Sequence, residues 1–151
     1  MKKIIAYLVL VGVVDVLLLA ATKVGQVPQW WSALGLALEC ALIGGIGGVV
    51  YCLRGVYLNA CVQKSWDDEW QPWYYIRPIV SHLCGAISFV FLKAGLLVLE
   101  AQPKADTTDL GFLALAFIAG LNVDKFISKI EDLAQATWGI EKSRASKGQG
   151  E

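Results

Sequence analysis

Hydrophobic residues along the chain gather into four blocks, and the length of each block decides what kind of helix it predicts. The first three blocks cover residues 4–22, 30–52 and about 74–99. Each reaches the roughly 18–20 residues that cross a bilayer core of about 30 Å. The fourth stays apolar only from Leu110 to Leu121, and it needs an amphipathic continuation to residue 130 to span. We expect this last span to leave the membrane around residues 122–124 and to continue as a helix.

The pattern therefore predicts an all-α membrane protein with four transmembrane helices in one bundle, residues 1–142. The connections at residues 24–29 and 101–109 are short, whereas the connection at residues 53–73 is long. Its first part, residues 53–64, has helical character, and we expect it to extend the second span into the cytoplasm. The tail, residues 143–151, is small and polar, and we expect it to be mobile.

Positive charge near the span ends predicts the orientation, because cytoplasmic loops are enriched in Lys and Arg. With both termini in the cytoplasm, the outer loops hold only Lys23 and Lys104. The cytoplasmic side then holds Lys2, Lys3, Arg54, Lys64, Arg77, Lys125, Lys129, Lys142, Arg144 and Lys147. A cleaved signal peptide ending near Ala21 is the competing interpretation of the first block. We prefer a retained helix, because the apolar run is long for a signal peptide and contains Asp15.

Composition agrees with a membrane location. Apolar residues make up 56% of the chain and charged residues 17%, against about 25% charged residues in soluble domains. Thirteen Lys and Arg balance thirteen Asp and Glu, so the chain lacks the basic excess that nucleic-acid binding requires. High hydrophobicity also excludes intrinsic disorder.

Three charges inside the predicted spans are the first candidates for function, because a charge at the centre of a transmembrane helix costs about 2.5–3.5 kcal/mol. Asp15 and Glu39 lie near the middle of the first two spans, and Lys93 lies roughly 6–9 Å further outward on the third. One interpretation is an ion or proton pathway lined by the two carboxylates. A second interpretation is a structural ion pair, in which Lys93 neutralises one carboxylate while the second carboxyl stays protonated. A third is that Lys93 extends to the outer interface on its own.

Other residues of the spans favour packing roles. His82 is the only histidine, and we expect it to be a hydrogen-bonded residue of the bundle. Gly44, Gly45 and Gly48 form a small face on the second span, on which another helix can approach closely. That helix belongs either to the same chain or to a second copy.

An aromatic segment precedes the third span. Trp66, Trp70 and Trp73 are expected to anchor it at the membrane interface. Trp66 and Trp70 are four residues apart, so one helical turn would place both on the membrane face. The intervening acidic run, residues 67–69, is expected to face water.

No catalytic constellation occurs in the sequence. The cysteines, Cys40, Cys52, Cys61 and Cys84, form no CxxC pair, and we expect free thiols rather than disulfides or a metal site. Phosphate-binding, dinucleotide-binding and zinc motifs do not occur in the sequence. We therefore expect no enzyme activity, cofactor or metal.

Four segments carry a resemblance to a known group of proteins. The first is a Gly-rich second span that runs into Leu53-Arg54-Gly55-Val56-Tyr57, and the second is the entry into the third span, Trp70-Gln71-Pro72-Trp73 with Arg77-Pro78. The third is the stretch 91–97, and the fourth is the apolar stretch 111–121, which ends in Gly120-Leu121. Over about residues 44–140 the chain resembles small four-helix bacterial inner-membrane proteins of unassigned function. The resemblance implies the bacterial inner membrane and the same architecture. At residues 122–124 this chain has Asn-Val-Asp where the group usually has Phe-Ser-Glu.

Three functions remain open at this stage. The first is an oligomeric, pore-like protein or membrane effector subunit built from several copies of the chain. The second is a small proton-coupled transporter that uses Asp15 as its titrating group. The third is a structural membrane protein that recruits a cytoplasmic protein partner through residues 53–73 and 124–147.

Overall fold

The computed structural model describes residues 1–24, 29–96 and 108–140, and all regular structure in those ranges is helical. Five α-helices are joined by short turns or by residues outside the described ranges. In chain order they are α1 (Lys2–Val24), α2 (Gln29–Tyr57), α3 (Gln71–Lys93), α4 (Thr108–Leu121) and α5 (Val123–Trp138). A π-helical turn, η1 (Leu58–Val62), and a 3₁₀ turn, η2 (Asp68–Trp70), lie between α2 and α3. The expected tail at 143–151 lies outside the described residues.

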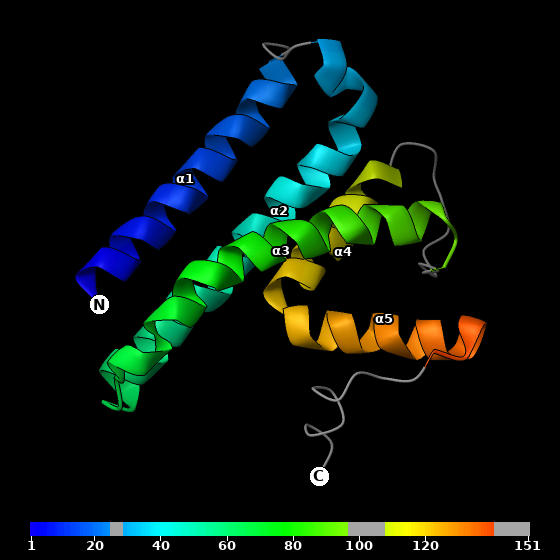
Figure 1. Cartoon of the computed structure of the whole chain (residues 1–151). Coiled ribbons are helices and arrows are strands. Elements are labelled where there is room, and N and C mark those ends of the chain that lie inside the picture. The colour runs from blue at the N-terminus through cyan, green and yellow to red at the C-terminus, as the bar shows by residue number, and fades with distance from the viewer. Residues whose placement is uncertain (25–28, 97–107, 141–151) are drawn as a thin grey trace.

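α2 is the central helix of the molecule (Figure 1). α1 runs antiparallel to it on one side, and α3 and α4 pack against it. By length and composition, α1, the α2 region from Leu34 to Val62 and the α3 region from Asp68 to Lys93 are each sufficient to cross a membrane. A fourth span is reached in the described part of the chain if α4 and α5 are counted together.

Glycine explains how closely the helices around α2 approach. A Cβ atom built on Gly44 would lie 2.7 Å from the Cα of Gly85 on α3. A Cβ on Gly120 of α4 would strike the backbone of Gly44, and one on Gly48 would strike the side chain of Ser81. The small face of α2 is therefore filled by α3 and α4 of the same chain. This answers the open question of which helix lies against Gly44, Gly45 and Gly48.

The third helix differs from the expected range of 74–99. It begins at Gln71 and ends at Lys93, because Gly95 adopts a left-handed conformation with φ of 71°. The Gly95 N–H donates to the carbonyl of Leu92 at 3.0 Å, and the Leu96 N–H donates to that of Phe91 at 3.0 Å. These two bonds form a Schellman motif, which terminates a helix whatever the polarity of the following residues. The expected residues 97–99 lie outside the described part of the chain.

The expected span 110–130 is two helices rather than one. α4 ends at Leu121, Asn122 leaves the helical conformation with ψ of 53°, and α5 begins at Val123. The two helix axes are bent by 110°. The predicted break around residues 122–124 is thus present, but it turns the chain sharply, so α5 does not continue the direction of α4.

The helical extension expected at residues 53–64 is present through the end of α2 and η1. Beyond it, Lys64 has a positive φ of 54° and Asp67 is extended. Trp66 therefore lies outside any helix, and Trp70 closes the 3₁₀ turn. The expectation that Trp66 and Trp70 share one helical turn is wrong, because the chain reverses between η1 and α3.

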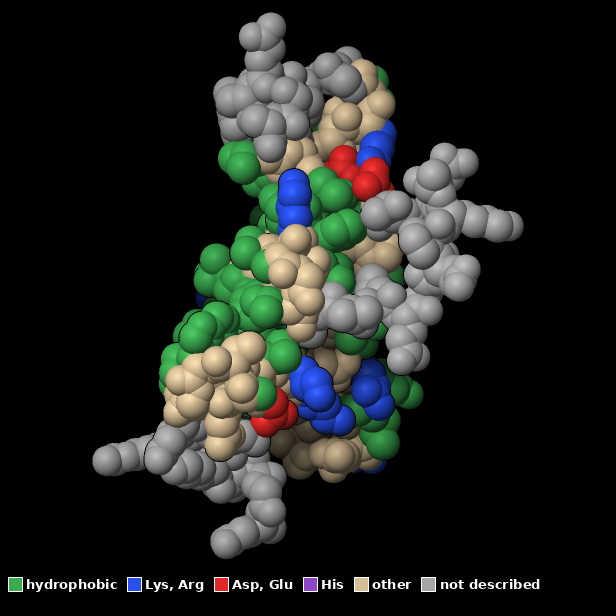
Figure 2. All heavy atoms as spheres, turned by 90° about the vertical axis from the view of Figure 1, so that its right-hand side faces the viewer, with side chains coloured by type: hydrophobic (Ala, Val, Ile, Leu, Met, Phe, Trp, Pro, Cys, Tyr) green, Lys and Arg blue, Asp and Glu red, His purple; other side chains and the backbone are tan. Residues whose placement is uncertain are grey.

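Large hydrophobic side chains are exposed over much of the surface, including most of α1. Figure 2 shows hydrophobic side chains between two groups of charged ones on one face. On α1 only Ile4, Leu8 and Asp15 are buried. The exposed positions of this helix include Val9, Leu10, Val13, Val14, Val16, Leu17 and Leu18.

Candidate functional site

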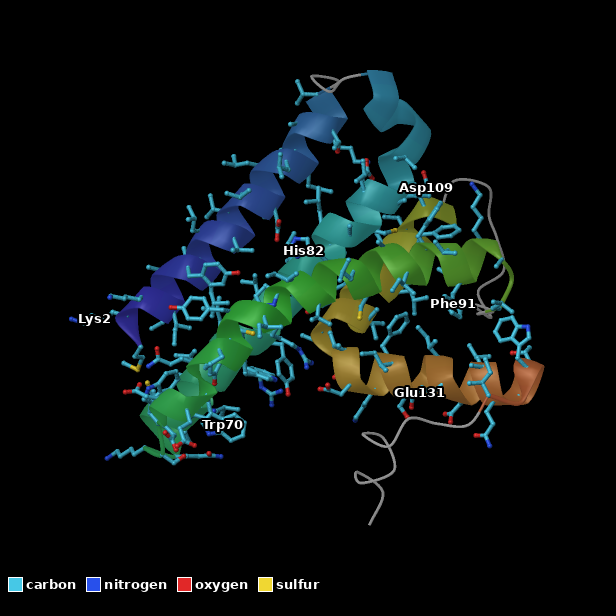
Figure 3. All side chains as sticks on the ribbon, in the orientation of Figure 1. Lys2, Trp70, His82, Phe91, Asp109 and Glu131 are labelled. Atoms are coloured by element: carbon cyan, nitrogen blue, oxygen red, sulfur yellow. The ribbon has the colours of Figure 1, made fainter. Side chains whose placement is uncertain are left out.

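Asp15 of α1 and His82 of α3 form a polar contact between helices in the middle of the bundle (Figure 3). The Asp15 Oδ1 lies 3.0 Å from the His82 Nε2. The other ring nitrogen, Nδ1, lies 2.8 Å from the carbonyl oxygen of Pro78, one turn earlier on α3. The ring is therefore held at both nitrogens.

These two contacts fix the position of the ring proton. A carbonyl oxygen only accepts hydrogen bonds, so Nδ1 must carry the hydrogen in its contact with Pro78. Nε2 is then bare in the neutral ring, and its contact with Asp15 also requires a hydrogen. Either the carboxyl is protonated and donates to Nε2, or the imidazolium donates to the carboxylate. In both cases a single proton lies between the groups and the pair is neutral.

The surroundings of Asp15 isolate it. Asp15 is 4% exposed, and its second oxygen, Oδ2, is buried and has no hydrogen-bond partner among the described residues. α2 provides space for the imidazole through Gly45, because a Cβ there would overlap the His82 ring. The site is thus built by three helices, with the acid on α1, the base on α3 and a glycine on α2.

Glu39 lies apart from this pair. Both of its carboxylate oxygens lie 2.8 Å from the Lys23 Nζ, and the Thr22 hydroxyl donates to Oε1 at 3.3 Å. This contact joins the end of α1 to α2. The two carboxylates therefore have separate partners, and a pathway lined by both stays a prediction.

Lys93 does not neutralise either carboxylate. Its Nζ lies 5.3 Å from the centre of the Phe89 ring, at the last turn of α3. The partners of Asp15 and Glu39 are His82 and Lys23 instead. The structural ion pair expected for Lys93 is thus replaced by a cation–π contact.

Arg77 is a buried cation, which the sequence indicated only as a marker of the cytoplasmic side. It is 5% exposed and lies over the rings of Tyr51, at 4.7 Å, and Trp73, at 5.2 Å. Its Nη1 donates to the Asp124 Oδ2 at 2.8 Å, which ties the first turn of α5 to α3. An arginine six residues inside an apolar helix, next to Trp and Tyr, was the signal for this role.

Ser81 reinforces the same junction. Its hydroxyl is fully buried and lies 2.9 Å from the Arg77 carbonyl and 3.0 Å from the Gly120 carbonyl. The bond to Gly120 crosses from α3 to α4. Together with Arg77 and Asp124, it fixes the point at which α4 turns into α5.

Aromatic rings close the end of the bundle where α3 begins. Tyr74 is 2% exposed and is stacked on Trp66, with ring centres 5.5 Å apart, while Trp73 meets it edge to face at 5.1 Å. Trp70 is 60% exposed. Of the three expected anchors, Trp66 and Trp73 thus pack against the bundle, and only Trp70 is largely exposed.

Cys40, Cys52 and Cys84 are buried free thiols, and Cys61 is an exposed one. Within residues 1–24, 29–96 and 108–140, no three His, Cys, Asp or Glu side chains are arranged to hold a metal ion. The carboxyl of Asp15 and the imidazole of His82 are within hydrogen-bond distance, so the two groups can exchange a proton. Comparisons with protein-family models, curated proteins and solved structures gave no match.

Proposed function

We propose that this chain is a small integral membrane protein that couples its activity to protons through Asp15 and His82. The observation that carries the proposal is the Asp15 carboxyl, almost fully buried, with one oxygen on the imidazole and the other unpartnered. Intramembrane ionisable residues are costly and usually mark proton or ion pathways. The proposed class is a proton-coupled transporter in the bacterial inner membrane, with both termini in the cytoplasm.

The proton count of the pair supports this class. While the proton is present, the pair is neutral and both groups are hydrogen-bonded. Once it leaves, a carboxylate faces the bare lone pair of Nε2 in a low-dielectric interior, which is unfavourable. Loss of the proton therefore favours separation of α1 from α3, and such a coupling between protonation and helix position is what a proton-coupled transporter needs.

α1 is suited to such a movement. It makes few buried contacts, through Ile4, Leu8 and Asp15. Its contacts with α3 are far fewer than those between α2 and α3. α3 and α4 lie against α2 through close glycine contacts, so α1 is held against α2 less closely than they are.

The oligomeric pore that we also considered needs a different arrangement. The glycine face of α2 is occupied by α3 and α4 of the same chain, which leaves little room for a passage there within one copy. A pore would have to be lined by surfaces of several copies, and nothing in the described residues specifies that contact. The transporter proposal therefore has the stronger support.

Proton flux into proteoliposomes tests the proposal. Vesicles containing the purified protein and an internal pH dye receive a potassium diffusion potential that drives protons inward. We expect the internal pH to fall faster than in protein-free vesicles, and the difference to disappear in Asp15→Asn. Glu39→Gln is the matched control and should retain the flux. Equal flux in wild type and Asp15→Asn, or no flux above protein-free vesicles, would refute the proposal.

A further inference from the structure

A hollow of about 220 Å³ lies between η1 and η2, on the segment that leads from α2 to α3. Its walls include three aromatic rings, two amides and a carboxylate. We call it the aromatic basin, and the residues used below are Asn59, Gln63, Trp66, Asp67, Trp70 and Tyr74. His82 lies eight residues further along α3 than Tyr74, and the basin shares no side chain with the Asp15 site among the described residues.

The walls of the basin are held by contacts independent of any ligand. The Trp66 indole N–H donates to the Asp68 Oδ1 at 3.0 Å, and its ring stacks on Tyr74. The Asn59 amide donates to the Tyr74 hydroxyl at 3.2 Å. The turn is shaped by the π-helical η1 and by Lys64 at positive φ, and π-helical turns are frequent at functional sites. The basin is thus largely preformed.

Its chemistry selects for an organic cation. Among the described residues, Asp67 is the one charged side chain that lines the basin. Tryptophan and tyrosine rings attract cations within about 6 Å of the ring centre, and aromatic cages recognise alkylated ammonium groups. A hard divalent cation takes about 6–8 oxygen ligands, with carboxylates prominent among them, whereas the basin offers one carboxylate, two side-chain amides and one aliphatic hydroxyl among its aromatic rings. An ammonium group suits the basin better.

An adjoining hollow of about 280 Å³ supplies the opposite charge. It shares Asn59, Gln63, Trp70 and Tyr74 with the basin, and it adds Arg54. Trp70 lines both hollows, and a carboxylate lines the first whereas a guanidinium lines the second. A ligand with an ammonium and a phosphate separated by a short linker would meet both.

We propose that the aromatic basin binds the ammonium group of a zwitterionic phosphate ester, while Arg54 in the adjoining hollow receives the phosphate. Phosphoethanolamine and phosphocholine compounds have this chemistry. They occur both as lipid headgroups and as free solutes. The place of the basin, at one end of two candidate spans, is compatible with either source.

Saturation-transfer NMR on the full chain in phosphatidylglycerol nanodiscs tests this binding. The probes are tetramethylammonium, which carries only the cation, and phosphocholine, which carries both groups. We expect both probes to bind saturably and phosphocholine to bind more tightly. Trp70→Ala and Asp67→Asn should weaken tetramethylammonium binding about tenfold. Arg54→Gln should leave the affinity for tetramethylammonium unchanged and lower the affinity for phosphocholine to the same level.

Two features keep the result interpretable. Asn is as good a cap as Asp, so Asp67→Asn preserves the turn that Asp67 caps through the Glu69 N–H. Trp138→Phe, at an exposed tryptophan on α5, should leave binding unchanged. Absence of saturable binding in the wild type, or binding in Trp70→Ala and Asp67→Asn that is as tight as in the wild type, would overturn the proposal.

A second set of nanodiscs separates the two sources of the ligand. Phosphatidylethanolamine in the bilayer should compete with tetramethylammonium if a lipid headgroup occupies the basin. If it does not compete while free phosphoethanolamine does, the ligand is a solute. Both results support an ammonium site and differ only in its source. If neither competes, the assignment to phosphate esters fails.

Discussion

At the scale of single residues, the contact between Asp15 and His82 is defined by where its hydrogen atoms must be. The Pro78 carbonyl accepts a hydrogen bond from the Nδ1–H of His82. The contact between Asp15 and Nε2 therefore depends on one exchangeable proton. Removing either partner leaves a buried polar group unsatisfied. Replacing the carboxyl by an amide does not, because an amide N–H can donate to the bare Nε2.

This difference predicts the stability of three variants. Asp15→Ala and His82→Ala should each lower the free energy of unfolding by about 1–3 kcal/mol. Asp15→Asn should stay within about 1 kcal/mol of wild type, although it removes the carboxyl group. Unfolding in mixed micelles, followed by circular dichroism, measures these values. A loss in Asp15→Asn as large as that in Asp15→Ala would show that the hydrogen bond is not formed as described.

The residue scale also shows what the sequence could and could not predict. Depth along a straight span follows from 1.5 Å per residue, and it correctly marked Asp15 as a charge inside a helix. Depth does not tell which way a side chain points around the helix axis. Asp15, Glu39 and Lys93 were therefore grouped by depth, although the first two have different partners and the third lies over Phe89.

At the scale of helices, close contact depends on a few glycines, and the described chain offers a matched control for them. Gly120 of α4 lies against the backbone of Gly44, whereas a Cβ on Gly35 of α2 would have no atom within 4 Å. Backbone cannot move aside as a flexible side chain can, so a methyl group at Gly120 must push α4 away from α2.

Gly120→Ala should therefore destabilise the protein by about 1–3 kcal/mol, the usual cost of overpacking. Gly35→Ala should be neutral or slightly stabilising, since Ala is favoured over Gly in helices by about 1 kcal/mol. The same micelle unfolding experiment measures both. Similar stabilities for the two variants would mean that α2 and α4 are further apart than described.

The places of the first three helices were predictable from the apolar runs, but helix ends were not. The position of Gly95 ended α3 before the apolar run did, because its conformation is set by the Schellman bonds. The direction of α5 likewise depends on a long-range contact, Arg77 to Asp124. A contact between residues 47 positions apart leaves no trace in local hydrophobic periodicity.

At the scale of the whole molecule, the proposed orientation makes a prediction about Cys61. It is the exposed thiol among the four cysteines, which are all described, and it lies in η1, on the side where the termini are proposed to be cytoplasmic. A membrane-impermeant maleimide should label it in inverted vesicles but not in intact spheroplasts. Cys61→Ser should abolish the labelling. Labelling from the outside of intact spheroplasts would reverse the proposed topology.

The proposed coupling to protons depends most on the proton shared by Asp15 and His82. His82 is the only histidine, so labelling histidine with ¹⁵N gives an NMR spectrum of this one ring without further assignment. In bilayers we expect Nδ1 to carry hydrogen across the pH range, while the Nε2 resonance moves as the shared proton is lost. Asp15→Asn should abolish that movement. A bare Nδ1, or an Nε2 resonance that titrates equally in Asp15→Asn, would contradict the account.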